Sequence, residues 1–286
     1  MGPRRINRIN TGYRLLIVGL LAGAWLLGAT GSGAARSAPN SFADLVELLT
    51  PAVVNIATSF QPEAQDQESP FGELPPGTPH EEFYEFFNRR GNGPSQPITS
   101  LGSGFIVHPD GLVVTNNHVI ADADEITVVL NDNTRLKAEI LGRDPKTDLA
   151  LLKIDNGESL PYVEFGDSDA ARVGDWVIAI GNPFGLGNTV TAGILSARGR
   201  DINAGPYDNF LQTDAPINRG NSGGPMFDMN GKVIGVNTLI YSPSGGSVGI
   251  GFATPSAIVG PVIDQLRQYG QTRRGWLGVR IQSVSP

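Results

Sequence analysis

Hydrophobic residues in this 286-residue chain recur in short runs separated by turn signals, a pattern typical of β-strands. The runs predict two series of strands: 53–59, 104–107, 112–115, 125–130, 136–141 and 149–154, and then 176–180, 189–197, 210–213, 233–237 and 249–253. Apolar spacing of three and four residues predicts helices at 41–50 and 255–269. Such short, evenly spaced strands favour an all-β barrel or sandwich. Two six-stranded barrels, at about 52–155 and 170–255, accommodate both series.

A long insertion at 61–98, rich in Pro, Gly, Glu and Gln, follows the first strand. It contains the aromatic residues Phe83, Tyr84, Phe86 and Phe87. One interpretation is a disordered loop; the other is a surface that contacts a partner, because exposed aromatic clusters mark interaction sites.

The N-terminal residues 1–35 have the layout of a secretory signal peptide. Four arginines precede an apolar run at 15–29, and small residues follow at 31–35. The apolar run is shorter than the ~20 residues that a membrane span needs. We therefore expect a secreted protein, with an uncleaved membrane anchor as the alternative.

Composition narrows the classes of function. The net charge is −7, and removal of residues 1–35 with their four arginines leaves 17 basic against 28 acidic residues, a charge of −11. An acidic body of this kind argues against nucleic acid as a partner. There is no cysteine, and the three histidines are scattered, so we expect no metal and no cofactor.

The segment 218–225, Asn-Arg-Gly-Asn-Ser-Gly-Gly-Pro, places one serine, Ser222, among three glycines. Glycines permit a tight turn that presents a hydroxyl beside backbone N–H groups. Acyl-transfer chemistry needs this combination of a nucleophile and oxyanion donors. A glycine-rich surface loop is the alternative reading.

Three histidines compete for the role of general base. His80 lies in the polar insertion, and His108 lies in a His-Pro-Asp-Gly turn, whereas His118 follows a buried strand and can point into a cleft. A hydrogen-bonded core histidine remains the alternative for His118. The acid candidate is Asp148, the last polar residue before an apolar strand; Asp144 competes with it, but its place before proline suits a turn better.

The order His118, Asp148, Ser222 is that of the chymotrypsin-type catalytic triad. Three motifs carry a wider resemblance: Thr-Asn-Asn-His-Val at 115–119, Thr-Asp-Leu-Ala-Leu-Leu at 147–152, and Gly-Asn-Ser-Gly-Gly-Pro at 220–225. From about residue 41 to its end, the chain resembles the HtrA/Deg family of serine endopeptidases.

The resemblance implies a chymotrypsin-like double β-barrel domain at 41–270, with the site between the barrels. Ser222 is then the nucleophile, His118 the general base and Asp148 the residue that orients it. The N–H groups of Gly220 and Ser222 are the expected oxyanion donors. The implied activity is cleavage of unfolded or damaged proteins in the periplasm or cell envelope, by a homotrimer or larger oligomer.

The resemblance also implies a substrate site in which the peptide pairs with an exposed strand edge near 249–253, opposite 239–243. Ile217, Leu239 and Ile250 are expected to shape the main specificity pocket, which predicts small or medium apolar side chains before the cut. Their alternative role is ordinary core. The full set of expected substrate-binding residues is Ile217, Gly220, Asn221, Leu239, Ile240, Tyr241, Ile250, Gly251 and Phe252.

The C-terminal segment 274–286 resembles the first strand of a truncated PDZ domain, which implies binding of peptide C-termini by the missing region. A C-terminal strand of the protease itself is the alternative. Residues 198–209 match the loop that in this family relays binding at the PDZ domain to the active site. Thr254 departs from the family pattern, which usually has an aliphatic residue there.

Two functions compete with an endopeptidase. The first is a chaperone or peptide-binding module with minor peptidase activity; unchanged substrate length after incubation would indicate it. The second is an esterase that uses the same triad; the relative rates on ester and protein substrates distinguish it from an endopeptidase.

Overall fold

The computed structural model describes residues 38–60, 98–182, 187–218, 220–243, 246–275 and 278. The predicted signal peptide, the aromatic cluster of the insertion and most of the predicted PDZ strand lie outside these residues. The features below belong to one compact unit, Ala43–Pro286.

The first barrel is closed by six antiparallel strands in the order β1-β2-β3-β6-β5-β4. Its core is aliphatic, with Ile56, Ile106 and Leu152 buried at its centre. β-Branched and aliphatic side chains suit a pleated surface buried on one face. The strands are β1 Val53–Phe60, β2 Ile98–His108, β3 Leu112–Asn116, β4 Glu125–Val129, β5 Arg135–Asp144 and β6 Leu149–Ile154.

The second barrel is closed in the order β10-β11-β12-β9-β8-β7. Its core contains Val177, Leu195 and Met226. The strands are β7 Trp176–Gly181, β8 Thr189–Arg200, β9 Phe210–Thr213, β10 Pro225–Phe227, β11 Val233–Ile240 and β12 Gly251–Pro255. The predicted fold class, a chymotrypsin-like pair of six-stranded barrels, is confirmed. The strand β10 was not predicted, because its three residues show no period.

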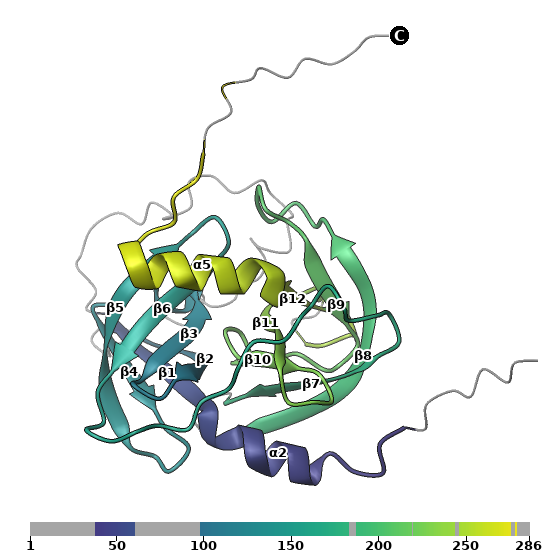
Figure 1. Ribbon diagram of the computed structural model, residues 1–286, viewed down its shortest axis with the longest axis horizontal. Coiled ribbons are helices and arrows are strands. Elements are labelled where there is room, and N and C mark those ends of the chain that lie inside the picture. Colours follow the sequence, from purple (N-terminus) through teal and green to yellow (C-terminus); the bar gives the residue numbers. More distant parts are fainter. Residues whose placement is uncertain are drawn as a thin grey trace, which may run out of the picture. The chain divides into compact units, whose positions relative to one another are not determined.

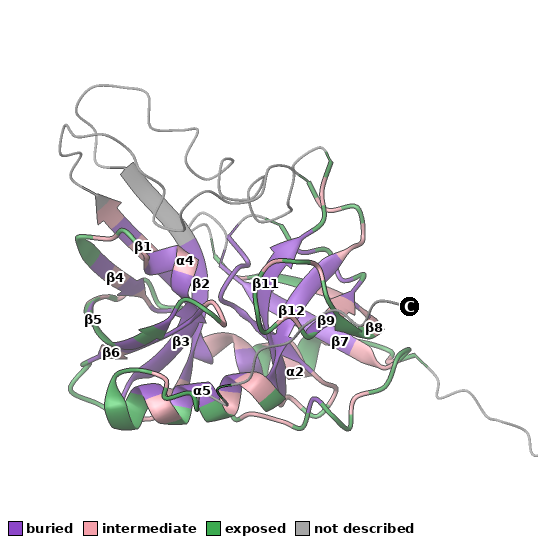
Figure 2. Cartoon of the chain, turned by 90° about the horizontal axis from the view of Figure 1, so that it is seen from above, coloured by how far each residue is buried: buried purple, intermediate pink, exposed green. Residues whose placement is uncertain are grey.

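Buried residues concentrate on the strands of both barrels, while exposed residues lie on turns and on the outer side of α5 (Figure 2). The helix α5, Ser256–Tyr269, packs against β5 and β6 of the first barrel and against β11 and β12 of the second (Figure 1). It ends at Gly270, whose left-handed backbone allows its N–H to donate to the carbonyl of Leu266. The helix therefore fixes the two barrels to one another.

Three shorter helical elements accompany the first barrel. The helix α2, Ala43–Leu49, and the 3₁₀ turn Thr50–Ala52 lead into β1, close to the helix expected at 41–50. The one-turn helix α4, Asn117–Ile120, follows β3 directly. It was not predicted, since four residues are too few to show a helical period.

Candidate functional site

His118 and Asp148 form a hydrogen-bonded pair on the first barrel. His118 lies in α4, and its Nδ1 is 2.6 Å from Oδ2 of Asp148. The backbone N–H of His118 donates to Oδ1 of the same carboxylate at 2.8 Å. Asp148 therefore holds the histidine at two points, which orients its ring. Both side chains are largely buried, so solvent screens the pair weakly.

The turn between β5 and β6 presents Asp148 in an unusual conformation. Asp148 has φ +54°, a left-handed value that non-glycine residues rarely adopt. Its carbonyl accepts hydrogen bonds from the N–H of Asn117 at 3.1 Å and from Nδ2 of Asn116 at 2.7 Å. The segment around α4 therefore fixes both the main chain and the side chain of Asp148.

Asp144, at the start of the same turn, is a structural anchor. Its carboxylate accepts from Oγ1 of Thr147 at 2.6 Å and pairs with the guanidinium of Arg274, whose Nη1 lies 2.9 Å from Oδ1. Burial acts to raise the pKa of Asp144, but the hydrogen bonds from Arg274 and Thr147 outweigh it and hold that pKa below its ordinary value. The same bond raises the pKa of Arg274.

Ser222 lies in the tight turn that precedes β10. The backbone of Gly223 has φ +84°, and a Cβ there would lie 2.2 Å from the carbonyl oxygen of Ser103, so only glycine fits. The carbonyl of Ser222 accepts from the N–H of Ser103 on β2 at 2.8 Å. The N–H of Gly223 donates to the carbonyl of Asn237 on β11 at 2.8 Å. Strands of both barrels therefore hold the turn.

The structure brings the serine turn and the His118–Asp148 pair to one junction. A Cβ on Gly102 would meet the side chain of Val119, next to His118, at 2.6 Å and the carbonyl oxygen of Ser222 at 3.3 Å. Oγ of Ser222 donates to the carbonyl of Thr238 at 3.4 Å. Nδ2 of Asn116, which bonds to the Asp148 carbonyl, also reaches Oγ1 of Thr238 at 3.4 Å.

The backbone N–H groups of Gly220 and Ser222 flank the peptide that joins Gly220 to Asn221. Within the described residues, neither of them donates a hydrogen bond. Gly220 has φ +91°, again in the region that favours glycine. Two backbone donors two residues apart, beside a serine hydroxyl, can bind a negatively charged oxygen.

The expected substrate-binding residues divide into two apolar clusters. Ile217 packs with Ala179 and Ile240, and a Cβ on Gly251 would lie 2.7 Å from Cγ1 of Ile217. The second cluster consists of Leu239, Phe210 and Phe252 with the half-buried Ile250 against them. The structure therefore does not place Leu239 and Ile250 in the same cluster as Ile217. Asn221 is buried, and Tyr241 is exposed.

The free strand edge lies at a different place from the one expected. β12 is paired on both sides, with Gly251 opposite Ile240 of β11 and Thr213 of β9, so the edge expected near 249–253 is covered from Gly251 onward. β10 pairs with β11 only as far as Val236. Among the described residues, the stretch 238–240 of β11 has no strand partner on the side of Ser222.

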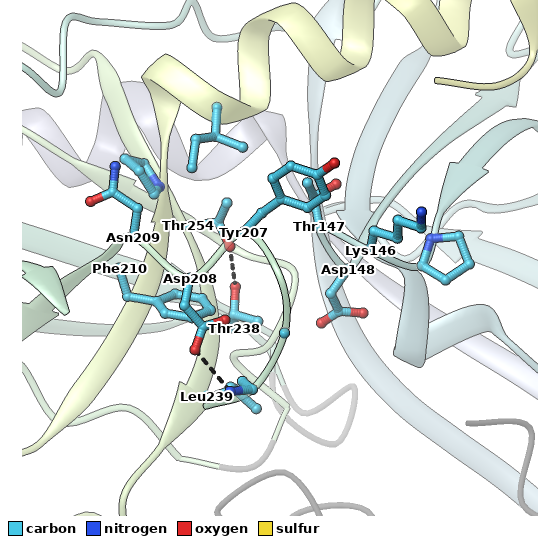
Figure 3. Close-up of a pocket in the computed structure, with 15 residues that line it drawn as sticks. Lys146, Thr147, Asp148, Tyr207, Asp208, Asn209, Phe210, Thr238, Leu239 and Thr254 are labelled. Atoms are coloured by element: carbon cyan, nitrogen blue, oxygen red, sulfur yellow. Dashed lines mark hydrogen bonds between the residues drawn. The ribbon is translucent and has the colours of Figure 1, made fainter. Parts of the chain in front are cut away.

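A cavity of about 40 Å³ lies behind Asp148 (Figure 3). Lys146, Thr147 and Asp148 line one side of it, and 207–210 with Thr238 and Thr254 line the other. Thr254 stands where the family usually has an aliphatic residue. Its Oγ1 is hydrogen-bonded to Oγ1 of Thr238 at 3.0 Å, so this buried hydroxyl has a partner. The volume suits one or two waters, not a peptide side chain.

No group of three or more His, Asp or Glu side chains in the described part of the chain is arranged to hold a metal ion. None of the described helices is long and apolar enough to cross a membrane.

The double barrel, with a histidine–aspartate pair and a glycine-flanked serine where the barrels meet, defines the trypsin-like class. Residues 102–236 match the family described as "Trypsin-like peptidase domain". Among solved structures, the chain is similar to the HtrA-type protease AlgWS227A with decapeptide: 43% identity, a TM-score of 0.72, and coverage of 86% of this chain and 72% of that one. The chain belongs to the HtrA family of proteases.

Other relatives agree with this assignment. The chain is 52% identical over 269 residues to a "Probable periplasmic serine endoprotease DegP-like" of Brucella suis, and 54% identical over 258 residues to one of Rickettsia conorii. These matches cover 85% and 87% of this chain but 52% and 50% of the relatives, so the chain spans about half their length. The serine endoprotease from Yersinia pestis is 36% identical with a TM-score of 0.63, and the match covers 85% of this chain and 73% of that one.

Proposed function

We propose that this chain is a serine endopeptidase that cleaves polypeptides through an acyl-enzyme. The observation that carries the proposal is the His118–Asp148 pair, held by two hydrogen bonds of 2.6 and 2.8 Å where the serine turn meets the first barrel. The relatives named serine endoprotease support it.

In this mechanism Oγ of Ser222 attacks a peptide carbonyl while Nε2 of His118 takes the hydroxyl proton, and His118 later gives that proton to the leaving amine. Asp148, bound to Nδ1, keeps the proton on that nitrogen and stabilises the imidazolium. The hydroxyl of Ser222 first has to leave its 3.4 Å bond to Thr238, and a rotation about its side-chain torsion achieves this.

The negative oxygen of the tetrahedral intermediate is assigned to the N–H groups of Gly220 and Ser222. Both donors are unused within the described residues, and the positive φ of Gly220 supports a preformed turn. The loss of one such donor raises the barrier by ~3 kcal/mol.

The substrate backbone is assigned to the free edge of β11 at 238–240, beside Ser222. The side chain before the cut is then assigned to the apolar surface formed by Ile217, Ile240 and Gly251. These residues carry no charge, which supports a preference for small or medium apolar side chains. Leu239, Ile250 and Phe252 are assigned to neighbouring positions of the peptide.

The names of the relatives support a periplasmic location. Unfolded or damaged proteins are the proposed substrates, and the proposed assembly is a homotrimer or larger oligomer. The proposed domain limits are a signal peptide at 1–35, a protease domain at 41–270 and the start of a PDZ domain at 274–286, whose continuation would bind peptide C-termini.

The test is cleavage of one protein, offered folded and unfolded, by this chain and by Ser222→Ala. The proposal predicts fragments from the unfolded form and none with Ser222→Ala. Intact substrate that remains bound to both proteins would instead support the peptide-binding module. Fragments with both proteins would contradict the assignment of Ser222.

A further inference from the structure

Ser103 on β2 is bonded to two segments: Asn182, which follows β7, and the oxyanion turn, residues 220–223 around Ser222. Its Oγ donates to the carbonyl of Gly220 at 2.5 Å and accepts from the N–H of Asn182 at 2.7 Å. Its own N–H donates to the carbonyl of Ser222 at 2.8 Å. The side chain is 0% exposed, so no solvent competes for these bonds.

The bond to Gly220 fixes one peptide plane inside the turn. The peptide between Gly220 and Asn221 has its carbonyl held by Ser103, and its N–H donates to the carbonyl of Asn218 at 3.1 Å. A peptide that is bonded at both polar ends cannot rotate without losing a buried hydrogen bond. The orientation of this plane constrains the N–H groups of Gly220 and Ser222, which lie on either side of it.

Ser103 is itself held by both barrels. Oγ1 of Thr115 on β3 donates to its carbonyl at 2.7 Å. Asn182 follows β7 of the second barrel, and Nδ2 of Asn55 on β1 joins the carbonyls of Gly102 and Asn182 at 3.1 and 2.9 Å. These bonds fix the position of the Ser103 hydroxyl, and so the position from which it bonds to the Gly220 carbonyl.

We propose that Ser103 is a positioning residue that keeps the oxyanion turn in its donating geometry. The inference rests on the proposed endopeptidase function and adds a residue that touches neither the substrate nor the reacting atoms. Without the hydroxyl, the carbonyl of Gly220 and the N–H of Asn182 lose their buried partner. The peptide plane between Gly220 and Asn221 is then free to rotate, and the N–H groups of Gly220 and Ser222 lose the constraint that it provides.

The test compares Ser103→Ala with a matched control, Ser256→Ala. The hydroxyl of Ser256 also joins two backbone groups: it accepts from the N–H of Ser168 at 3.0 Å and donates to the carbonyl of Gly166 at 2.7 Å. Ser256 is 5% exposed and begins α5. Both variants therefore lose one buried bridging hydroxyl, but only one of the two hydroxyls touches the oxyanion turn.

The proposal predicts that Ser103→Ala lowers kcat on a peptide substrate by ~10- to 100-fold while KM changes less than threefold, because the loss falls on the transition state. Affinity for a peptide boronate, whose tetrahedral oxygen occupies the oxyanion position, falls by a similar factor. Ser256→Ala keeps kcat within about twofold despite a similar fall in Tm. Equal kcat in the two variants would overturn the proposal.

A second readout separates this proposal from the proposed function. If the unaltered chain cleaves no peptide, the endopeptidase assignment fails, and amide hydrogen exchange at Asn182 still tests Ser103. Exchange at Asn182 at least ~10-fold faster in Ser103→Ala than in Ser256→Ala would support the role of Ser103 as an anchor. An unchanged rate would overturn it.

Discussion

Replacement of Arg274 by alanine tests how residues beyond α5 support the site. The guanidinium of Arg274 pairs with Asp144, at the start of the turn that ends at Asp148. It also lies over the ring of Tyr207, with Cζ 4.6 Å from the centroid. We expect Arg274→Ala to destabilise the protein, because the carboxylate of Asp144 is only 3% exposed and would lose its charged partner.

The size of the effect follows from burial. Removal of one partner from a fully buried pair costs about 3–5 kcal/mol. Here Arg274 is 26% exposed, and Thr147 still donates to Asp144, so we expect ~2 kcal/mol at neutral pH. For a domain of this size that corresponds to a fall in Tm of about 4–8 °C.

The effect should depend on pH in a defined direction. Because the folded pKa of Asp144 lies below the unfolded value of ~3.9, its ionised form contributes stability above about pH 4, and this contribution disappears as the pH falls through the folded pKa. In Arg274→Ala, the carboxylate of Asp144 stays buried but loses the guanidinium that favours its ionised form, so its pKa rises. The difference in Tm between the unaltered protein and Arg274→Ala should therefore become smaller as the pH falls from 7 to ~3.5.

The assay is thermal unfolding followed by circular dichroism at pH 7 and at acid pH. Arg273→Ala is the matched control, because the guanidinium of Arg273 lies over Tyr269 at 3.7 Å, on the outside of α5. We expect Arg273→Ala to lower Tm by about 2 °C or less at both pH values. Equal Tm values for the two variants at pH 7, or a loss of Tm in Arg274→Ala that grows in acid, would show that Arg274 does not stabilise the ionised form of Asp144.

Three other substitutions test the site. Asp148→Asn should lower kcat by about 10⁴-fold, because the amide favours the wrong tautomer of His118, and steady-state kinetics measures this. Gly223→Ala should abolish soluble folded protein or lower Tm by more than about 8 °C, because its Cβ would lie 2.2 Å from the Ser103 carbonyl oxygen; thermal unfolding measures this. Gly251→Ala should shift cleavage toward smaller side chains, because its Cβ would lie 2.7 Å from Ile217, and mass spectrometry of the fragments measures this.

For each of the three substitutions, one result would contradict the expectation. Activity of Asp148→Asn within tenfold of the unaltered chain would mean that Asp148 does not set the tautomer of His118. A Gly223→Ala protein with unchanged Tm would contradict the close approach to β2. Unaltered fragments from Gly251→Ala would place the specificity pocket elsewhere.

The sequence predicted the barrels because short hydrophobic runs separated by turn residues recur along the chain. It missed β10 and α4, since three or four residues are too short to show a period. It also misplaced the free edge, because strand pairing depends on contacts that no local pattern encodes: β12 is enclosed between β9 and β11.

Motif spacing led to His118, Asp148 and Ser222, and the structure joins the first two directly. The contacts that support them were not predicted. Ser103 lies 117 residues before Gly220, and Asp144 lies 130 residues before Arg274. A serine in a strand and an arginine after a helix carry no local signal of such contacts, so only the folded chain reveals them.

The role of Ser222 as a nucleophile activated by His118 is tested most directly by the mass of the intact protein after reaction with a fluorophosphonate, followed by peptide mapping. We expect a single adduct on Ser222, with labelling at least ~100-fold slower in His118→Ala, because the histidine activates the hydroxyl. An unlabelled chain, an adduct on another residue, or equal labelling of His118→Ala would rule out this pair of roles.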